Sequence, residues 1–258
     1  MLKRATAEDF NEILRLCGDD LIGTRILCYI LAYGFERDFL EIWIIKENEV
    51  VIGVLAKFYD DVTLLCKDSA DIEQLSAFIG MFYFGKLMCK AELCEKLGFE
   101  NITVKKAYVY NGYETDFPSE SLEEENYEKA YSLISTEIPG SFSKDNEAYL
   151  SFLSDFTFRK RRSLARGVCS TDNGEVISVA LTSSETETSA VISGVACNRS
   201  KQKHGLGKKT VLSLVNELKR NNKKAYVIAL NESAEGFYEH IGFEMTGKIA
   251  FVERNNNV

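Results

Sequence analysis

The stretch from Val191 to Arg220 constrains the fold more strongly than any other part of the sequence. It opens with an apolar, β-branched run that ends near Cys197, continues through a polar turn with two glycines, and from Leu206 onward repeats apolar residues at helical spacing. This order predicts a strand, a loop and a helix. Such a loop directs several backbone N–H groups to the space above the helix start, where the helix dipole adds partial positive charge. The segment therefore predicts a binding site for a phosphate group.

Two well-known phosphate loops do not fit this turn. A Walker loop needs a glycine and a Ser or Thr where the sequence has Gln202 and Lys209, and a dinucleotide fingerprint needs a third glycine where it has Thr210. The pattern that remains is Gln-x-x-Gly-x-Gly, from Gln202 to Gly207, directly after a strand.

A second motif follows the predicted helix. Residues 225–230, Ala-Tyr-Val-Ile-Ala-Leu, indicate a short buried strand, and Asn231 begins a polar break that supplies a helix-capping residue. Residues 234–243, Ala-Glu-Gly-Phe-Tyr-Glu-His-Ile-Gly-Phe, then predict a short helix with Gly242 at its C-terminal side.

Together the two motifs resemble the GNAT superfamily of N-acetyltransferases. The first is similar to its pyrophosphate loop, Arg/Gln-x-x-Gly-x-Gly/Ala, and the second to its signature of Asn followed by Ala-x-x-Phe/Leu-Tyr-Glu-x-x-Gly-Phe. The resemblance covers residues 166–254, with both motifs in the family's order. Two positions depart from the usual pattern, because Arg199 stands where the family often has Pro and Gln202 replaces the commoner Arg.

The N-terminal half repeats the order of elements predicted for the C-terminal half. Residues 93–100 align with 237–244 with four identities, and 51–54 align with 176–179. We infer two copies of one α/β unit. The fold class that the resemblance implies is α/β (α+β, mixed sheet): tandem GNAT-like units, each a mostly antiparallel sheet that is splayed at the acyl-CoA site and flanked by helices. The predicted boundaries are a degenerate unit at 1–112, a linker at 113–125 and an acetyltransferase domain at 126–258.

Local patterns predict the individual elements. Apolar spacing indicates a helix over 21–33 and strands over 50–58, 176–182 and 189–197, whereas Ser183 and Ser184 are expected to open a polar loop.

The two copies differ at the phosphate loop. The first copy has Lys-Asp-Ser-Ala-Asp at 67–71, without glycine and with two carboxylates that would repel a diphosphate. It also has Cys94 where the second copy has Tyr238, so we expect that it has lost cofactor binding.

The resemblance implies a set of acetyl-CoA-binding residues. Backbone groups of Val195 and Cys197 would pair with the pantetheine arm and the acyl carbonyl, and Asn231 would either bond the arm or a water, or only cap its helix. Backbone N–H groups of the loop would hold the diphosphate, with lysines adding charge or only facing solvent. The cofactor-binding residues implied in this way are Val195, Ala196, Cys197, Gln202, Lys203, His204, Gly205, Leu206, Gly207, Lys208 and Asn231. No metal is expected.

The reaction implied is direct attack of a primary amine on the thioester, helped mainly by alignment and by hydrogen bonds to the oxyanion. Tyr238 lies where the family places a hydroxyl near the sulfur, and it would donate a proton to the CoA thiolate; packing beside Phe237 is the plainer alternative. Some family members carry a Glu base where this sequence has Val191. A water chain, or an acid such as Glu185 or Glu187, is the expected substitute.

Composition limits the class of protein further. A net charge of −8 argues against a non-specific nucleic-acid binder. The seven cysteines contain no Cys-x-x-Cys, which argues against a disulfide framework or a zinc site and favours a reducing, cytoplasmic location. No apolar stretch of about 18 residues occurs, so no membrane span or secretory leader is expected. The expected partners are acetyl-CoA and an amine acceptor, with homodimer formation left open.

Two further functions stay open at this point. One is a non-catalytic acyl-CoA-binding or regulatory module, which the missing Glu and the degenerate first half would suit. The other is a transferase of longer acyl or aminoacyl groups, which would use the same fold. The nature of the acceptor amine does not follow from the sequence.

Overall fold

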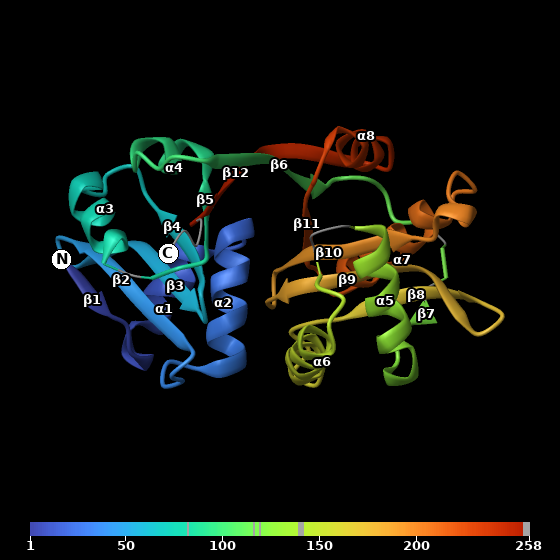
Figure 1. Ribbon diagram of the computed structural model, residues 1–258. Coiled ribbons are helices and arrows are strands. Elements are labelled where there is room, and N and C mark those ends of the chain that lie inside the picture. Colours follow the sequence, from blue (N-terminus) through green and yellow to red (C-terminus); the bar gives the residue numbers. More distant parts are fainter. Residues whose placement is uncertain (82, 116, 119, 139–141, 255–258) are drawn as a thin grey trace. The chain divides into compact units, whose positions relative to one another are not determined.

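A computed structural model describes residues 1–254 apart from 82, 116, 119 and 139–141 (Figure 1). The chain forms two compact units. The first comprises residues 1–108, 228–235 and 245–258, and the second comprises residues 109–227 and 236–244. The units are described separately below, over the described residues of each.

The first unit is a sheet with the strand order β1-β2-β3-β4-β5-β12-β6. Its elements are β1 (Leu2–Arg4), the 3-10 turn η1 (Ala7–Asp9), α1 (Phe10–Cys17), α2 (Leu21–Tyr33), β2 (Leu40–Glu47), β3 (Val50–Phe58), β4 (Asp61–Cys66), α3 (Ile72–Gly80), β5 (Lys86–Lys90), α4 (Ala91–Lys96), β6 (Ile102–Tyr110) and β12 (Phe243–Glu253). Strand β4 pairs with β5 in parallel, whereas β1, β2, β3 and β4 pair successively in antiparallel fashion and β12 pairs antiparallel with β5.

Local sequence explains where the first helices begin and end. The Asp20 side chain accepts hydrogen bonds from the amides of Ile22 and Gly23, which caps α2, and Gly34 ends the helix with φ +75°. The apolar residues of α3, including Leu75 and the fully buried Ile79, then pack into a core with residues of β3, β4, β5 and β12. Burial of this apolar face supplies the main driving force for the unit.

The second unit has the strand order β11-β10-β9-β8-β7. Its elements are β7 (Glu120–Ser121), the 3-10 turn η2 (Glu124–Asn126), α5 (Tyr127–Glu137), α6 (Asn146–Lys160), β8 (Gly167–Asp172), β9 (Glu175–Glu185), β10 (Ser189–Cys197), the 3-10 turn η3 (Arg199–Lys201), α7 (Leu206–Arg220), β11 (Lys224–Ile228) and α8 (Glu232–His240), the last divided between the units after Glu235. Strand β10 pairs in parallel with β11, and the pairings β10–β9, β9–β8 and β8–β7 are antiparallel.

Helices cover both faces of the second sheet. Helices α5 and α6 pack on one face through a core cluster that includes Ile134, Phe156 and Ala196. The next residue of β10, Cys197, points to the other face, where Gly207 of α7 lies beside it. The start of α7 is therefore placed directly against the end of β10.

The two halves of the chain, β1 to β6 and β7 to β12, have the same succession of strands and α-helices, which confirms the predicted fold class of tandem α/β units with mostly antiparallel sheets. Residues 249–253 of β12 pair with β5 and belong to the first compact unit, and the boundaries 1–112, 113–125 and 126–258 stay predictions. The polar loop predicted at Ser183 and Ser184 is wrong: β9 continues through both serines to Glu185.

The segment predicted as a linker at 113–125 is partly docked on α7. Thr115 exchanges hydrogen bonds with the side chain of Asn216, and Glu114 pairs with Arg220 at 2.9 Å. Residues 116 and 119 of this segment lie outside the described residues. Side chains of α7 thus bind part of the predicted linker through hydrogen bonds and an ion pair.

Candidate acyl-CoA site in the second unit

The centre of the second sheet opens where β10 and β11 stop pairing. Their parallel register runs from Ser189 beside Lys224 to Ile192 beside Val227, and no pairing of β10 with β11 is found beyond it in the described chain. On its other side β10 carries a bulge between Ser193 and Ala196, at which Gly194 has φ +54°. Val195 lies within this bulge and outside the regular register of the two strands.

The loop after β10 is held by its own side chains. The Asn198 side chain accepts from the amide of Ser200 at 3.0 Å, which caps the short turn 199–201. The Gln202 side chain donates through Nε2 to the carbonyl of Cys197 at 2.9 Å. Gln202 thus ties the loop to the end of the strand, and it occupies the Cys197 carbonyl that the prediction left for the pantetheine arm.

Helix α7 starts without a side-chain cap. Its N-cap is Gly205, with φ +76° and ψ 1°, and Lys203 two residues earlier also has positive φ. Within the described part of the chain, no acceptor is found for the amides of Lys203, His204, Gly205, Leu206 and Lys208. The Gly207 amide contacts the Cys197 sulfur. Most N–H donors of this loop and first helical turn are therefore free to bind an anion.

The cations around this loop fall into two groups. Lys201 is bound to Asp172 at 2.8 Å, and Arg199 to Glu137 at 3.2 Å. Lys203, Lys208 and Lys209 have no carboxylate partner among the described residues. Three uncompensated positive charges thus add to the partial charge of the helix start.

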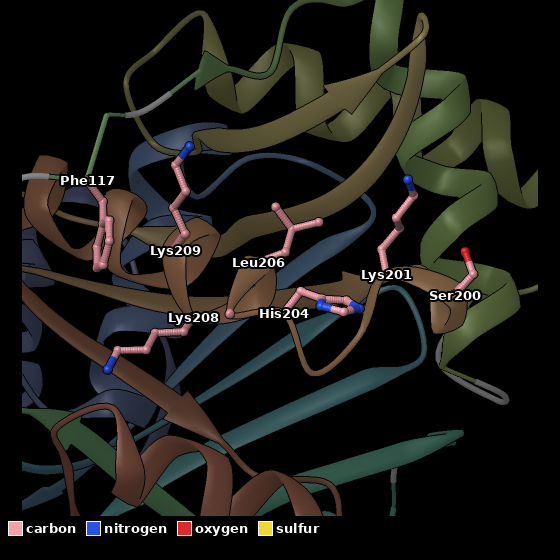
Figure 2. A pocket seen from close by; sticks show the side chains of 8 residues that line it. Phe117, Ser200, Lys201, His204, Leu206, Lys208 and Lys209 are labelled. Atoms are coloured by element: carbon pink, nitrogen blue, oxygen red, sulfur yellow. The ribbon is translucent and has the colours of Figure 1, made fainter.

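A cavity of about 970 Å³ opens at the same place. It is lined by Phe117, Ser200, Lys201, His204, Gly205, Leu206, Lys208 and Lys209. Figure 2 shows Lys208 and Lys209 leaving the first turn of α7 in different directions, with His204 and Lys201 on the other side of Leu206. The structure therefore brings His204, Gly205, Leu206 and Lys208 of the predicted loop to one cavity.

The space beside Gly207 shows whether a side chain could be accommodated at this position. A Cβ built there would make only ordinary contacts, 3.9 Å from Cys197 Cβ and 4.0 Å from Phe237 Cζ. Its φ lies outside the positive range, so the fold does not require glycine at this helical position, where alanine is intrinsically better. The open space fits a group brought close to the backbone, as a bound phosphate would be.

Tyr238 is 6% exposed and lies on α8 against two rings. The ring centroids are 5.3 Å from that of Phe237 and 5.4 Å from that of Phe243. We find no hydrogen bond to its hydroxyl in the described residues. Burial raises the pKa of Tyr238 above the ordinary tyrosine value, so the phenol stays protonated at neutral pH and can act as a donor.

Other predicted residues have structural partners. Ala196 contributes to the core beneath α5, and its carbonyl accepts from Ser178 at 3.3 Å. Asn231, which belongs to the first compact unit, accepts from the Ala234 amide at 2.9 Å and so caps α8. The pKa of the Cys197 thiol is raised by burial, which keeps it protonated and argues against a nucleophilic role.

The acids predicted as substitute bases lie in the turn between β9 and β10 or at its edge. Glu185 is fully buried and bound by Arg166 at 2.9 Å and Lys223 at 2.8 Å. It pairs with Ala190 of β10, one residue from Val191, the place where some family members carry the Glu base. Exposed Glu187 lies in the same turn. Glu185 is therefore held in a buried charge cluster by two cations, and its role as a base stays a prediction.

Sequence analysis did not identify Glu137, the last residue of α5. Its carboxylate accepts from both the backbone amide and the side chain of Arg199, each at 3.2 Å, and its side chain is only 11% exposed. It fixes the first residue of the loop. Glu137 lies 62 positions before Arg199, so the sequence around the loop gives no indication of this contact.

No cluster of three or more potential metal ligands occurs among the described residues, and no described helix is long and apolar enough to cross a membrane.

Comparisons with known proteins fit this geometry. The family model described as "Acetyltransferase (GNAT) family" matches residues 114–243. A search of curated proteins gave no match. A solved tandem GNAT protein from the clavulanic acid biosynthesis pathway superposes with a TM-score of 0.64 at 12% identity, covering 100% of this chain and 99% of that one.

Two further solved structures have the same fold. A GCN5-related N-acetyltransferase from Sphaerobacter thermophilus gives a TM-score of 0.64 at 12% identity, covering 98% of this chain and 95% of its own. A GNAT acetyltransferase from Colwellia psychrerythraea gives 0.60 at 11% identity, covering 99% and 100%. At these identities the likeness extends to the fold and not to the substrate.

Proposed function

The chain belongs to the acetyltransferase (GNAT) family, whose model matches half of it, and we propose that its second unit transfers the acetyl group of acetyl-CoA to a primary amine. The single observation that carries this proposal is the start of α7. There an uncapped left-handed glycine, a series of amides and two lysines, Lys208 and Lys209, meet at a cavity, and none of these amides and lysines has a partner among the described residues.

The diphosphate of CoA suits this set of donors. Free amides of residues 203–206 and 208 would bind its oxygens, and Lys203 and Lys208 would add charge without competing carboxylates. The pantetheine arm would lie where β10 and β11 separate after Ile192. Val195, in the bulge, would offer backbone groups to the arm or to the thioester carbonyl.

The reaction proceeds by direct attack. The amine nitrogen forms a bond with the thioester carbonyl carbon, the carbon–sulfur bond then breaks, and the surplus proton of the amine passes to water. Tyr238 donates its phenolic proton to the departing sulfur and later regains one from solvent. Its raised pKa and unpaired hydroxyl support this role, because the proton is present at neutral pH and bound to no other group.

A non-catalytic acyl-CoA-binding module is the second candidate. The observation that favours it is the lack of a suitable base: Val191 replaces the family's Glu, and Glu185 is held by Arg166 and Lys223. A water chain would have to accept the proton of the amine if the protein is an enzyme. The acceptor, a cytoplasmic location and a homodimer stay predictions.

Binding and turnover together test the proposal. Acetyl-CoA should raise the unfolding temperature, because a ligand that binds the native state stabilises it by RT ln(1 + [L]/Kd). A panel of primary amines should then release free CoA thiol above the rate of hydrolysis. Stabilisation without thiol release from any amine would favour the binding module, and no stabilisation would contradict both candidates.

A further inference from the structure

We propose that Phe117 stacks on the adenine ring of coenzyme A, and that residues 110–115, here called the strap, bind to α7 and so position Phe117 at the cavity; this inference rests on the proposed function. Sequence analysis placed residues 113–125 in a linker and gave Phe117 no role. Four observations carry the inference: a buried anchor, further bonds along α7, the position of the ring, and the charge beside it.

The anchor is Asn216, which is 1% exposed in the interior of α7. Its Oδ1 accepts from the Thr115 amide at 3.1 Å, and its Nδ2 donates to the Thr115 carbonyl at 2.5 Å and hydroxyl at 2.9 Å. A buried amide that lost these partners would be costly, so the bonds fix Thr115 on the helix. Phe117 is two residues farther along the chain.

The rest of the strap is bound toward the other end of α7. Lys219 donates to the Gly112 carbonyl at 2.8 Å, and its ammonium lies 5.6 Å from the centre of the Tyr110 ring. Arg220 pairs with Glu114 at 2.9 Å. The strap therefore lies along α7 from its C-terminal turn to Asn216, and Phe117 lines the cavity at the first turn.

The position of the ring indicates its ligand. Phe117 lines the same cavity as Gly205 and Lys208 of the loop, and Figure 2 shows it on the side of the helix start from which Lys208 and Lys209 extend. In coenzyme A a single phosphorylated ribose separates the diphosphate from the adenine. A diphosphate on the loop would thus place a purine within reach of an aromatic face, and the lysines would face the ribose phosphate.

Substitution of Phe117 tests the inference, with Tyr113→Ala as the matched control. Tyr113 is an aromatic residue of the same strap and is 93% exposed. By calorimetry, Phe117→Ala should weaken CoA binding about 5- to 150-fold, the range of aromatic–base stacking, whereas Phe117→Trp should retain affinity within about threefold. Tyr113→Ala should leave the Kd unchanged.

A truncated ligand separates stacking from a general loss of the loop. S-acetyl-4′-phosphopantetheine lacks adenosine, so its Kd should be the same for wild type and Phe117→Ala. Equal weakening of both ligands would overturn the inference, as would an unchanged Kd for CoA. If the wild-type protein binds no CoA at all, the proposed function fails instead, so the two failures are distinguishable.

Discussion

The starts of α3 and α7 occupy corresponding places in the two units and have opposite chemistry. In the first unit Asp71 accepts from the Gln74 amide at 3.1 Å and caps α3, so a carboxylate of the protein occupies the helix start. In the second unit Gly205 leaves the same position without a side chain. The first helix start thus carries a carboxylate of the protein, and the second is open to an external anion.

The sheets around these helices remain similar. Strand β4 pairs with β5 from Asp61 to Thr63 and β10 pairs with β11 from Ser189 to Ile192, and each parallel pairing then ends while the earlier strand continues. The backbone opening is therefore common to both units. Under the proposed function, the opening does not by itself make a ligand site, because the two units differ in the residues at the helix start and not in the opening.

The largest expected effect comes from giving the second unit the chemistry of the first. Gly207→Asp places a carboxylate at the start of α7, where it repels the diphosphate and fills the space left by the glycine. CoA binding should become undetectable by calorimetry. Gly80→Asp is the control, because Gly80 ends α3 and a Cβ added there would meet no atom within 4 Å. Retained CoA affinity in Gly207→Asp would contradict the loop assignment.

The next effect compares Tyr238 with Cys94, its counterpart in the first unit. Tyr238→Phe removes the proton donor and keeps the ring, so kcat should fall about 100-fold, the lower end for general acid catalysis, while the Kd for CoA stays within about twofold. Cys94 is fully buried, and Cys94→Ala should leave kcat unchanged. Steady-state kinetics would reject the catalytic role if both variants turned over like wild type.

A smaller effect is expected from opening the helix start of the first unit. Asp71→Ala removes the cap of α3 and should lower the free energy of unfolding by about 1 kcal/mol, measured by urea denaturation. Ser69→Ala, in the same loop, is the control. Because the first unit also lacks the glycines of the second, Asp71→Ala should not add a CoA site. A second CoA-binding event in calorimetry would contradict this expectation and show that the Asp71 cap alone prevents CoA from binding to the first unit.

The smallest effect concerns pH. Burial raises the pKa of Tyr238, so its proton is present below that pKa and activity would be lost only as pH rises through it. We therefore expect no fall in kcat between pH 8 and about pH 10, the ordinary tyrosine value. A descending limb that starts below pH 9 and disappears in Tyr238→Phe would contradict the raised pKa.

Local sequence was sufficient for most elements. The predicted helix 21–33 and strand 50–58 agree with α2 and β3, because apolar spacing and flanking turn residues mark their ends. The strand, loop and helix around Gly205 are also confirmed. Strand β9 extends beyond its predicted end, because Ser184 and Glu185 are buried in it. Polar residues in a sequence suggest an exposed loop, and the partners that allow these two to be buried are not visible in the local sequence.

Long-range contacts could not be predicted in the same way. The bond from Thr115 to Asn216 spans 101 residues, and the bond from Arg199 to Glu137 spans 62. A buried Asn or a helix-terminal Glu has no sequence pattern that names its partner. The strap and the anchor of the loop therefore became visible only in three dimensions.

The pairing of β12 with β5 has a consequence for biosynthesis. Residues 86–90 leave the ribosome long before residues 249–253, so β5 waits with an unpaired edge while the second unit is made. A shortened chain that stops before β12 would leave the edge of β5 exposed and would be prone to aggregation. The truncation and the exposed strand would be far apart in the sequence. The sheet of the first unit can therefore be completed only after β12 has been synthesised.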